Sequence, residues 1–420
     1  MKASGGHHLS VWPLTPLSRL CTKISSGGTP SRKNSLYFAG EGHLWVKSKE
    51  LLDRPIDSSE EKITDEAVAD SAAKEYPPKT VLLAMYGANV GQLGFLRRAA
   101  TINQAICGLI VDNKVADPRY VFYALLYCRK FLTTKAFGAA QQNLNQALVR
   151  SFEIPSPPIE VQRRIVAVLS ACDDLIENNI HRIRLLEDIA RAVFTEWFAK
   201  FQFPGHEHAR FTDTAAGELP DDWRYMELGN LAIEVRDAVR PAEVDPETPY
   251  IGLEHIPRRS LALLEWGKAA DATSTKLKFV EGDVLFGKIR PYFHKVVVAP
   301  FDGICSSDTI VLRARDEKRW PLAIATAASD EFVKHATQTS QGTKMPRANW
   351  DVLKKYAVLI PSDALLQRFH SHMSSTVKLI QNLTMTIVFL RRTRDMILPK
   401  LVSGELDVSD LDIKMEEDQQ

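Results

Sequence analysis

Two segments of about forty residues each constrain the fold of this chain more than any other feature. The first runs from Ile159 to about Lys200 without a glycine or a proline, and its apolar residues recur every three or four positions. That spacing draws one apolar stripe along an α-helix. Forty helical residues span about 60 Å, more than the usual globular helix, so the stripe needs a long partner.

The second segment, from Leu365 to Ile397, carries the same stripe. We therefore expect the two helices to pair as an antiparallel coiled coil; the alternative is that each stripe packs into its own domain core. Asn179 and Arg394 lie near the stripes; buried polar residues can set the register of a helix pair, but we expect these two at its solvated edge. The residues predicted to form the helix pair and to dock partner chains are Ile165, Leu169, Ile176, Ile183, Leu186, Phe369, Ile380, Leu383, Ile387 and Leu390.

Landmarks outside these helices occur twice in the same order. The spacing W-x4-L-x2-L begins at Trp12 and again at Trp223, and an Ile-Pro-Ser run precedes each long helix, at 154–156 and at 360–362. Identity between the two halves is otherwise low. The chain therefore reads as two diverged copies of one unit, a pseudo-two-fold internal repeat.

The repeat predicts a mixed α/β (α+β) fold with two similar globular domains and two long helices. The expected segments are a first domain at 1–157, a first long helix at 158–203, a connector at 204–220, a second domain at 221–362, a second long helix at 363–403 and an acidic, frayed tail at 404–420. Within the domains we expect strands at 81–86, 106–111, 284–286, 295–299 and 309–313, and short helices at 64–74, 120–129 and 322–336.

Composition excludes several classes of protein. The chain has 420 residues and a formal net charge of +1, but residues 1–157 hold 19 basic against 13 acidic residues, and the tail holds one against seven. Local basic clustering of this kind is what a nucleic-acid footprint requires. Five scattered cysteines without a CxxC pair argue against disulfides and zinc, and favour a reduced, cytoplasmic setting. No signal peptide or membrane span is expected.

No motif in the sequence supports catalysis by this chain. Gly282-x4-Gly287-Lys288 has the skeleton of a phosphate-binding loop, but Ile289 stands where a Ser or Thr hydroxyl should meet Mg²⁺. GxGxxG, an Asp/Asn-Pro-Pro-aromatic run and a nuclease signature are all missing. The pair His370 and His372 falls on different faces of a helix, which makes shared metal ligation unfavourable. We therefore assign no catalytic and no metal-binding residue.

Loops that mix cations, amides and small residues are the candidate DNA-binding elements. Asn and Gln can pair bidentately with adenine and Arg with guanine, while neighbouring Lys and Arg hold phosphates. Gly-rich basic turns are often only turns, Phe293 beside Tyr292 can be a core residue, and an amide run can cap a helix. The predicted DNA-binding residues are Thr29, Arg32, Lys33, Arg97, Arg98, Gln141, Gln142, Asn143, Lys288, Arg290, Tyr292, Lys295, Lys344 and Arg347.

These motifs together resemble the DNA-specificity subunit of type I restriction-modification enzymes. The resemblance covers roughly residues 12–406, and its strength lies in the order and doubling of the motifs. They are Gly27–Ser31, Met85–Ala88, Asn143–Asn145, Ile154–Pro158 with Gln162, Leu219–Trp223, Lys288–Pro291 and Leu401–Leu406. The chain departs from the family pattern at Val11–Trp12–Pro13 and at Asp363–Ala364–Leu365, which leaves the start of the first domain open.

The resemblance implies a non-catalytic subunit whose two target-recognition domains each read half of a bipartite, asymmetric site in double-stranded DNA. It implies that the paired helices act as a spacer and dock two methyltransferase subunits, and through them two motor-nuclease subunits. S-adenosylmethionine, ATP and Mg²⁺ would then belong to the partners, with no cofactor bound by this chain. Two alternatives are a single-chain DNA methyltransferase or nuclease, and a structural coiled-coil adaptor without sequence-specific DNA contact.

Overall fold

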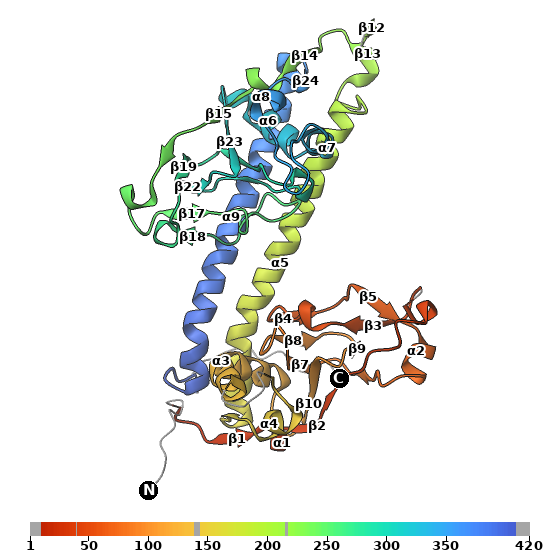
Figure 1. Ribbon diagram of the computed structural model, residues 1–420, viewed down its shortest axis with the longest axis vertical. Coiled ribbons are helices and arrows are strands. Elements are labelled where there is room, and N and C mark those ends of the chain that lie inside the picture. Colours follow the sequence, from red (N-terminus) through yellow and green to blue (C-terminus); the bar gives the residue numbers. More distant parts are fainter. Residues whose placement is uncertain (1–9, 39, 138–142, 215–216, 409–420) are drawn as a thin grey trace. The chain divides into compact units, whose positions relative to one another are not determined.

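The computed structural model describes residues 10–38, 40–137, 143–214 and 217–408. By its internal contacts the chain divides into two compact units. The first comprises residues 1–173 and 392–420, and the second comprises residues 174–391. The two long helices, α5 (Ile159–Phe198) and α9 (Asp363–Ser403), cross the boundary, so each unit includes a stretch of both (Figure 1).

In the first unit, a helix packs on one face of the larger of two antiparallel-rich sheets and forms the main core with it, and the smaller sheet packs on the other face. The larger sheet has the order β2 (Cys21–Ser26), β10 (Ile106–Val111), β7 (Val81–Ala84), β8 (Leu93–Leu96) and β4 (Arg54–Ile56). The smaller has the order β5 (Glu61–Ile63), β3 (His43–Val46), β9 (Ala100–Ile102) and β6 (Glu75–Tyr76). The helices are α1 (Leu17–Leu20), α2 (Asp65–Ala69), α3 (Pro118–Phe137) and α4 (Gln146–Ser151). Apolar residues of α3 and of the larger sheet share one buried cluster with the start of α5 and the end of α9.

The second unit repeats this plan with different strand lengths. One sheet has the order β15 (Ala232–Val235), β23 (Thr309–Ala314), β20 (Val284–Gly287) and β21 (Val296–Val298). The other has the order β16 (Ala238–Val239), β19 (Lys276–Phe279), β22 (Gly303–Ser306), β17 (Pro249–Ile251) and β18 (Gly267–Lys268). The helices are α6 (Trp320–Ala327), α7 (Asp330–Gln338) and α8 (Trp350–Leu353). The mixed α/β class predicted from the sequence is confirmed.

The same strand pairing opens and closes both globular parts, which is the structural form of the repeat. In the first unit β1 (Leu14–Pro16) pairs antiparallel with β11 (Glu153–Pro155), just before α5. In the second unit β14 (Arg224–Glu227) pairs antiparallel with β24 (Ala357–Ile360), just before α9. The leucines of the repeated W-x4-L-x2-L spacing are buried in both copies. The repeat in the sequence therefore marks the point where each domain returns to its long helix.

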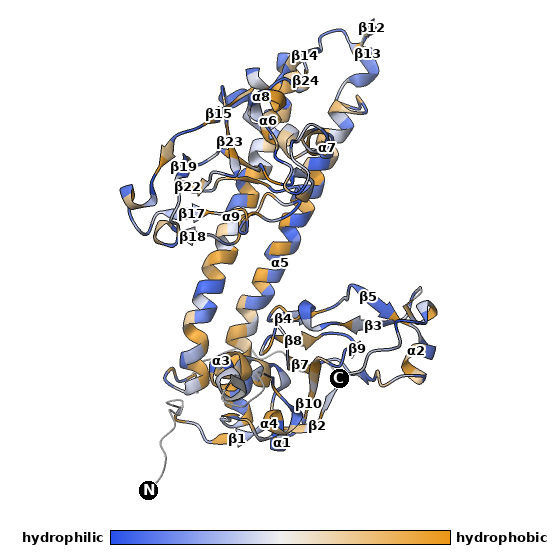
Figure 2. Ribbon diagram, in the orientation of Figure 1, coloured by the Kyte–Doolittle hydropathy of each residue, from blue (hydrophilic) through white to orange (hydrophobic). Residues whose placement is uncertain are grey.

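The long helices pack antiparallel through their apolar stripes. In the second unit Trp197 and Phe198, near the end of α5, contact Phe369 near the start of α9, with ring centroids 5.8 and 4.9 Å apart. Further along, Ile176 and Ile183 of α5 share a buried cluster with residues 380–387 of α9. Hydrophobic residues alternate with hydrophilic ones along both helices (Figure 2), as a half-buried helix requires. Covering one stripe with the other removes both from water.

Two polar residues near the stripes do not lie at a solvated edge, and that expectation is wrong. Asn179 is buried, with 2% of its surface exposed. Arg394 is mostly buried in the first unit, where its Nη1 lies 2.7 Å from Oδ1 of Asp173 on α5. The hydroxyl of Tyr123 donates to the other oxygen of that carboxylate at 2.7 Å. Arg394 is tolerated there because the opposite helix supplies its countercharge.

Three short elements differ from the sequence-based expectation. The helix capped by Thr64 ends at Ala69 rather than near Lys74, because the Ser71 hydroxyl donates to the Ala67 carbonyl and accepts from the Ala73 N–H. The predicted helix at 322–336 is two helices, since the Ser329 side chain accepts from the N–H of Phe332 and starts α7. The connector at 204–220 contains a hairpin of β12 (Phe211–Thr214) and β13 (Gly217–Pro220).

The start of the tail is also ordered against the first unit, contrary to the predicted fraying. Val408 is buried in the main core of that unit, and its carbonyl accepts from Arg164 of α5 at 3.3 Å. Residues 409–420 lie outside the described part of the chain. Among the described residues, no helix is both long enough and apolar enough to cross a membrane.

Candidate nucleic-acid interface

In the second unit, two loops that are far apart in the sequence form one surface. The first follows β20 and runs from Lys288 to Lys295. The second, residues 341–348, joins α7 to α8. Backbone bonds hold them together: the Arg290 N–H donates to the Pro346 carbonyl at 2.8 Å, and the Ala348 N–H donates to the Lys288 carbonyl at 2.9 Å. The structure thus brings together residues that the sequence analysis named from separate segments.

Cations without acidic partners gather on this pair of loops. Lys288, Arg290 and Lys344 make no ion pair with any described residue, whereas Arg347 lies 3.5 Å from Asp308 and is half-exposed. Arg290 adopts a left-handed backbone conformation with φ of 49°, and Pro291 follows it. A non-glycine residue held in that region carries strain, which the backbone bond to Pro346 maintains. Strain of this kind is commonly kept where a side chain must be presented in one direction.

Two aromatic residues stand beside these cations. Tyr292 is exposed, and its ring lies 4.9 Å from that of Phe293 in an edge-on arrangement. The guanidinium of Arg258 lies 4.1 Å from the centroid of the Phe293 ring, and that of Arg290 lies 5.9 Å from it. Phe293 is therefore a platform for two cations rather than a core residue.

Lys295, also predicted to bind DNA, turns its ammonium toward the protein. Its Nζ donates to the Leu253 carbonyl. Burial, and next the nearby charge of Arg258, lower the pKa of Lys295 below its ordinary value. Its contact with DNA stays a prediction, and the geometry gives the group a role in supporting the loop.

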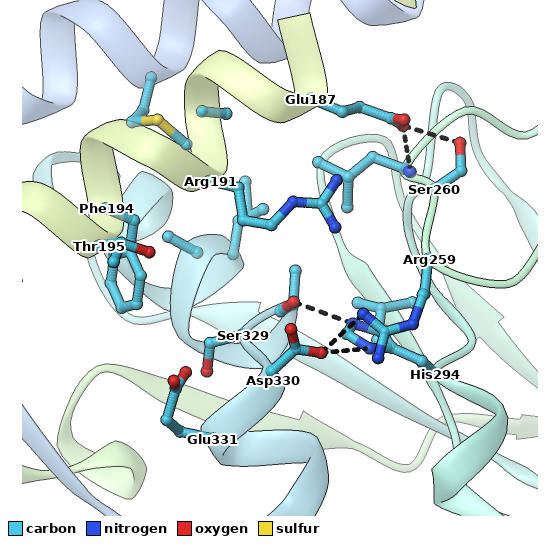
Figure 3. Close-up of a pocket in the computed structure, with 17 residues that line it drawn as sticks. Glu187, Arg191, Phe194, Thr195, Arg259, Ser260, His294, Ser329, Asp330 and Glu331 are labelled. Atoms are coloured by element: carbon cyan, nitrogen blue, oxygen red, sulfur yellow. Dashed lines mark hydrogen bonds and ion pairs between the residues drawn. The ribbon is translucent and has the colours of Figure 1, made fainter. Parts of the chain in front are cut away.

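Behind the second-unit loops, a cavity of about 120 Å³ lies between α5, α6 and the start of α7 (Figure 3). Nε2 of His294 donates to the Ala328 carbonyl at 2.9 Å, and its Nδ1 lies 3.4 Å from Asp330. Burial lowers the pKa of His294, which favours the neutral imidazole. Arg259 pairs with Asp330 at 2.8 Å. Glu187 of α5, also on the cavity wall, accepts hydrogen bonds from the loop that carries Arg259.

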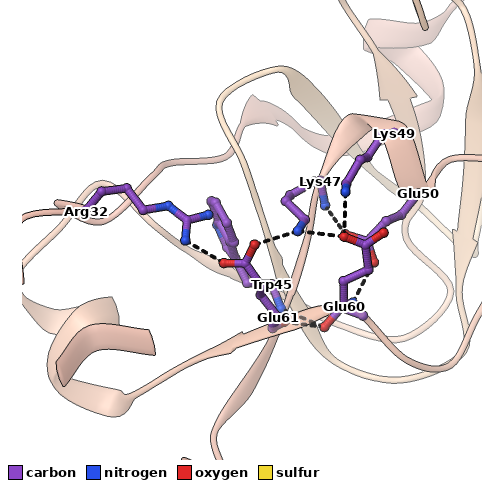
Figure 4. Close-up of polar contacts among 8 residues, drawn as sticks. Arg32, Trp45, Lys47, Lys49, Glu50, Glu60 and Glu61 are labelled. Atoms are coloured by element: carbon purple, nitrogen blue, oxygen red, sulfur yellow. Dashed lines mark hydrogen bonds and ion pairs between the residues drawn. The ribbon is translucent and has the colours of Figure 1, made fainter. Parts of the chain in front are cut away.

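In the first unit, Arg32 is held in a fixed orientation (Figure 4). Its Nη1 lies 2.6 Å from Oε2 of Glu61, and its guanidinium stacks 4.1 Å from the Phe38 ring centroid and 5.0 Å from that of Trp45. Hydrogen bonds from Arg32, and next from Lys47, lower the pKa of Glu61 to about 2. About half of the Arg32 side chain remains exposed. A guanidinium held this way is preorganised for a planar partner.

The Gly-rich run before Arg32 is a site of close packing. A Cβ on Gly27 would lie 1.9 Å from the Ile102 oxygen, and one on Gly28 would lie 2.2 Å from the carbonyl carbon of Ala72. Only glycine lets the backbone approach that closely. Close packing by itself therefore explains why this turn is rich in glycine. The neighbouring cations Arg32 and Lys33 remain on the surface.

The other DNA-binding candidates of the first unit are distributed as follows. Thr29 is exposed and contacts Gln104 through its hydroxyl. Lys33, Arg98 and Asn143 are exposed, while Arg97 is half-buried and lies 3.5 Å from Asp57. Gln141 and Gln142 lie outside the described residues. Their contacts with DNA stay predictions.

The ten residues named for the helix pair and for partner docking lie on the inner faces of the helices. Ile165 and Leu169 belong to the first unit's core, Phe369 belongs to the second unit's main core, and the remaining seven share the cluster between α5 and α9. Other apolar residues of the same helices are exposed. They include Leu185 and Ile189 of α5 and Phe389 of α9, whose surface is 69% exposed.

The described residues include no group of three or more His, Cys, Asp or Glu side chains that could hold a metal ion. Burial raises the pKa of Cys107, Cys128 and Cys305 to about 12, which keeps these thiols protonated and unreactive. Sequence reasoning missed Glu61, Glu187 and Arg258, because their roles depend on partners distant in the chain. Arg258 had one signal, its position in an Arg-Arg pair within a polar loop.

Comparison with known proteins finds similarity to specificity subunits of type I restriction enzymes. Residues 12–188 match the family model described as type I restriction modification DNA specificity domain. The type I restriction enzyme MjaIX specificity subunit of Methanocaldococcus jannaschii is 26% identical over 412 residues, which cover 93% of this chain and 92% of that protein. The MjaVIII specificity subunit of the same organism is 29% identical over 188 residues, covering 45% of this chain and 42% of that protein.

The fold agrees with a solved structure. The type I restriction-modification S subunit from M. genitalium superposes with a TM-score of 0.61 at 14% sequence identity, covering 96% of this chain and 98% of that one. The chain therefore carries a type I restriction modification DNA specificity domain over residues 12–188, and over nearly its whole length it is similar to a type I restriction enzyme specificity subunit.

Proposed function

We propose that this chain selects the DNA sequence at which a type I complex acts, by reading a bipartite site with two unlike recognition domains. The observation that carries the proposal is the joined pair of loops in the second unit, where Lys288, Arg290 and Lys344 lack acidic partners among the described residues. Unpaired cations on one loop surface attract the phosphates of DNA, and Arg347 beside them can read a guanine edge.

The two half-sites are expected to differ. In the first unit Arg32 stacks on Phe38 and Trp45, and in the second unit Arg290 and Arg258 flank Phe293. The segments at matching positions of the two repeat copies also differ: they are Gln141–Asn143 in the first and Met345–Arg347 in the second. Donor and acceptor sets this different match different base edges.

The paired helices serve as the spacer between the half-sites and as the docking surface for two methyltransferase subunits. The inner stripe is buried in the helix pair and the domain cores. The exposed apolar residues Leu185, Ile189 and Phe389 on the same helices are therefore the ones available to a partner. Two motor-nuclease subunits join through the methyltransferases.

Chemistry is divided between chains in this proposal. The partners bind S-adenosylmethionine for transfer of a methyl group to adenine N6, and ATP with Mg²⁺ for translocation and cleavage. A base must leave the duplex stack to be methylated, so the chain that reads the sequence need not hold the reactive site. This division fits a chain whose sequence has no recognisable catalytic motif.

The test is the host's genome-wide adenine methylation, mapped with and without this gene. We expect loss of methylation at one split motif with two unlike halves. A control strain that carries the gene with a stop codon in α5 should lose the same motif. An unchanged methylation map, in cells that express the methyltransferase subunits, would contradict the proposal.

A further inference from the structure

One loop of the second unit, residues 257–261, links the recognition surface to the long helix α5. Its two arginines have different partners: Arg258 stacks on Phe293, whereas Arg259 pairs with Asp330 at 2.8 Å. The Arg259 N–H donates to the His294 carbonyl at 2.9 Å. Arg259 has a φ of 55°, in the left-handed region. A loop with this strain keeps its shape only where tertiary contacts hold it.

Glu187 of α5 supplies two of those contacts (Figure 3). Its Oε1 accepts from the Ser260 hydroxyl and from the Leu261 N–H, both at 2.7 Å. The side chain is buried, with 8% of the residue exposed. A buried carboxylate is costly unless it is hydrogen-bonded, so its burial against this loop indicates that the loop position matters.

Arg258 is the residue that this loop presents. It is exposed, and it makes no ion pair with any described residue. Its guanidinium and that of Arg290 lie 4.1 and 5.9 Å from the centroid of the same Phe293 ring. Burial, and next the charge of Arg258, lower the pKa of Lys295. Like charges this close repel one another, and a bound anion relieves that repulsion.

We propose that Arg258 contacts a DNA phosphate next to the second half-site, and that Glu187 is the positioning residue that holds its loop in place. This inference rests on the proposed function, because it requires that the second unit binds DNA. It adds a contact outside the loops that the sequence analysis named. It also ties the placement of that contact to α5, the helix that serves as spacer.

The first experiment measures binding of the full chain to a duplex that carries the methylated motif and to a scrambled duplex. Arg258→Gln removes the charge, and Arg240→Gln is the matched control, an exposed arginine of the same unit already paired with Glu243. Arg258→Gln should weaken binding to both duplexes equally, by about tenfold. It should also reduce the slope of log affinity against log salt by about 0.9, while Arg240→Gln changes neither.

The results separate this inference from the proposed function. Wild-type binding that does not distinguish the two duplexes would contradict the proposed function. Normal wild-type discrimination with an unchanged affinity and salt slope for Arg258→Gln would overturn the phosphate contact alone. Weakening confined to the motif duplex would also overturn it, because it would make Arg258 a base-reading residue.

The second experiment tests Glu187 as a positioning residue. Glu187→Ala should weaken DNA binding and reduce the salt slope as Arg258→Gln does, and the double variant should be no weaker than Arg258→Gln alone. Glu187→Gln should restore binding, because its amide oxygen can accept both bonds. Additive losses in the double variant, or a Gln variant as weak as the Ala variant, would refute the positioning role.

Discussion

Replacing Glu187 tests how a buried carboxylate stabilises the second unit. Glu187→Ala leaves the Leu261 N–H without its acceptor, and the Ser260 hydroxyl loses the same partner. Leaving a buried donor without an acceptor costs roughly 1–3 kcal/mol in the free energy of unfolding. Removing the buried negative charge of Glu187 offsets part of that loss. We expect the Ala variant to lose about 2 kcal/mol in the free energy of unfolding.

At neutral pH, Glu187→Gln should change the free energy of unfolding in the direction opposite to Glu187→Ala. Burial raises the pKa of Glu187 above its ordinary value of 4.5. A raised pKa in the folded state contributes stability that is fully present below about pH 4.5 and is lost as the pH rises through the folded-state pKa. The Gln variant should therefore equal or exceed the wild-type stability at pH 7, and the two should converge in acid.

Urea unfolding followed by tryptophan fluorescence measures both effects. Trp197, Trp223 and Trp350 all lie in the core of the second unit and report its transition. The chain has two units, so the transition of the second unit is fitted by itself. If the Gln variant were as unstable as the Ala variant at pH 7, the negative charge rather than the acceptor would be holding the loop, and the reasoning would be wrong.

Four further predictions follow from the same structure. Arg347→Ala should relax discrimination at one base of the second half-site by about 1–3 kcal/mol, seen by binding to single-base variants of the motif; equal weakening on all duplexes would exclude base reading. Glu61→Gln should cost about 1 kcal/mol at pH 7, since its partly exposed pairs with Arg32 and Lys47 are screened by solvent. Because the folded pKa of Glu61 is lowered to about 2, that difference should vanish as the pH falls from 4.5 toward 2; a pH-independent difference would point to packing instead. Ile387→Ala should lower the free energy of unfolding of the second unit by about 2–5 kcal/mol in urea, whereas Phe389→Ala, at an exposed position, should change it little. Equal effects would mean that the apolar stripes of α5 and α9 are not packed as described. Deleting seven residues of α5 within 166–190 together with the seven opposed residues of α9 shortens the pair by about 10 Å, so mapped half-sites should move about three base pairs closer; unchanged spacing would remove the spacer role.

Much of the architecture was readable from the sequence because its signals are local. The stripe that predicts each long helix depends only on residues three and four positions apart, and both helices end within a few residues of the predicted bounds. The partner of each stripe followed because only two such stripes exist, whereas the sequence alone does not fix the antiparallel direction of the pair. The Ser71 and Ser329 side chains, which end or start short helices, were missed because such hydrogen bonds compete with the helical pattern at single positions.

The tertiary structure alone decided which predicted cations remain uncompensated. Arg32 is held by Glu61, 29 positions away in the chain, and the Lys295 ammonium turns to the Leu253 carbonyl, 42 positions away. Arg290 and Lys344 meet across 54 positions, where the Lys344 carbonyl accepts from the Arg290 guanidinium at 3.4 Å. The sequence by itself determined that the chain carries two copies of one domain, two paired long helices and basic loops. Which of those loops meet, and which charges they leave for DNA, depends on contacts between residues that no local pattern relates, and only folding brings them within the few ångströms over which ion pairs and hydrogen bonds act.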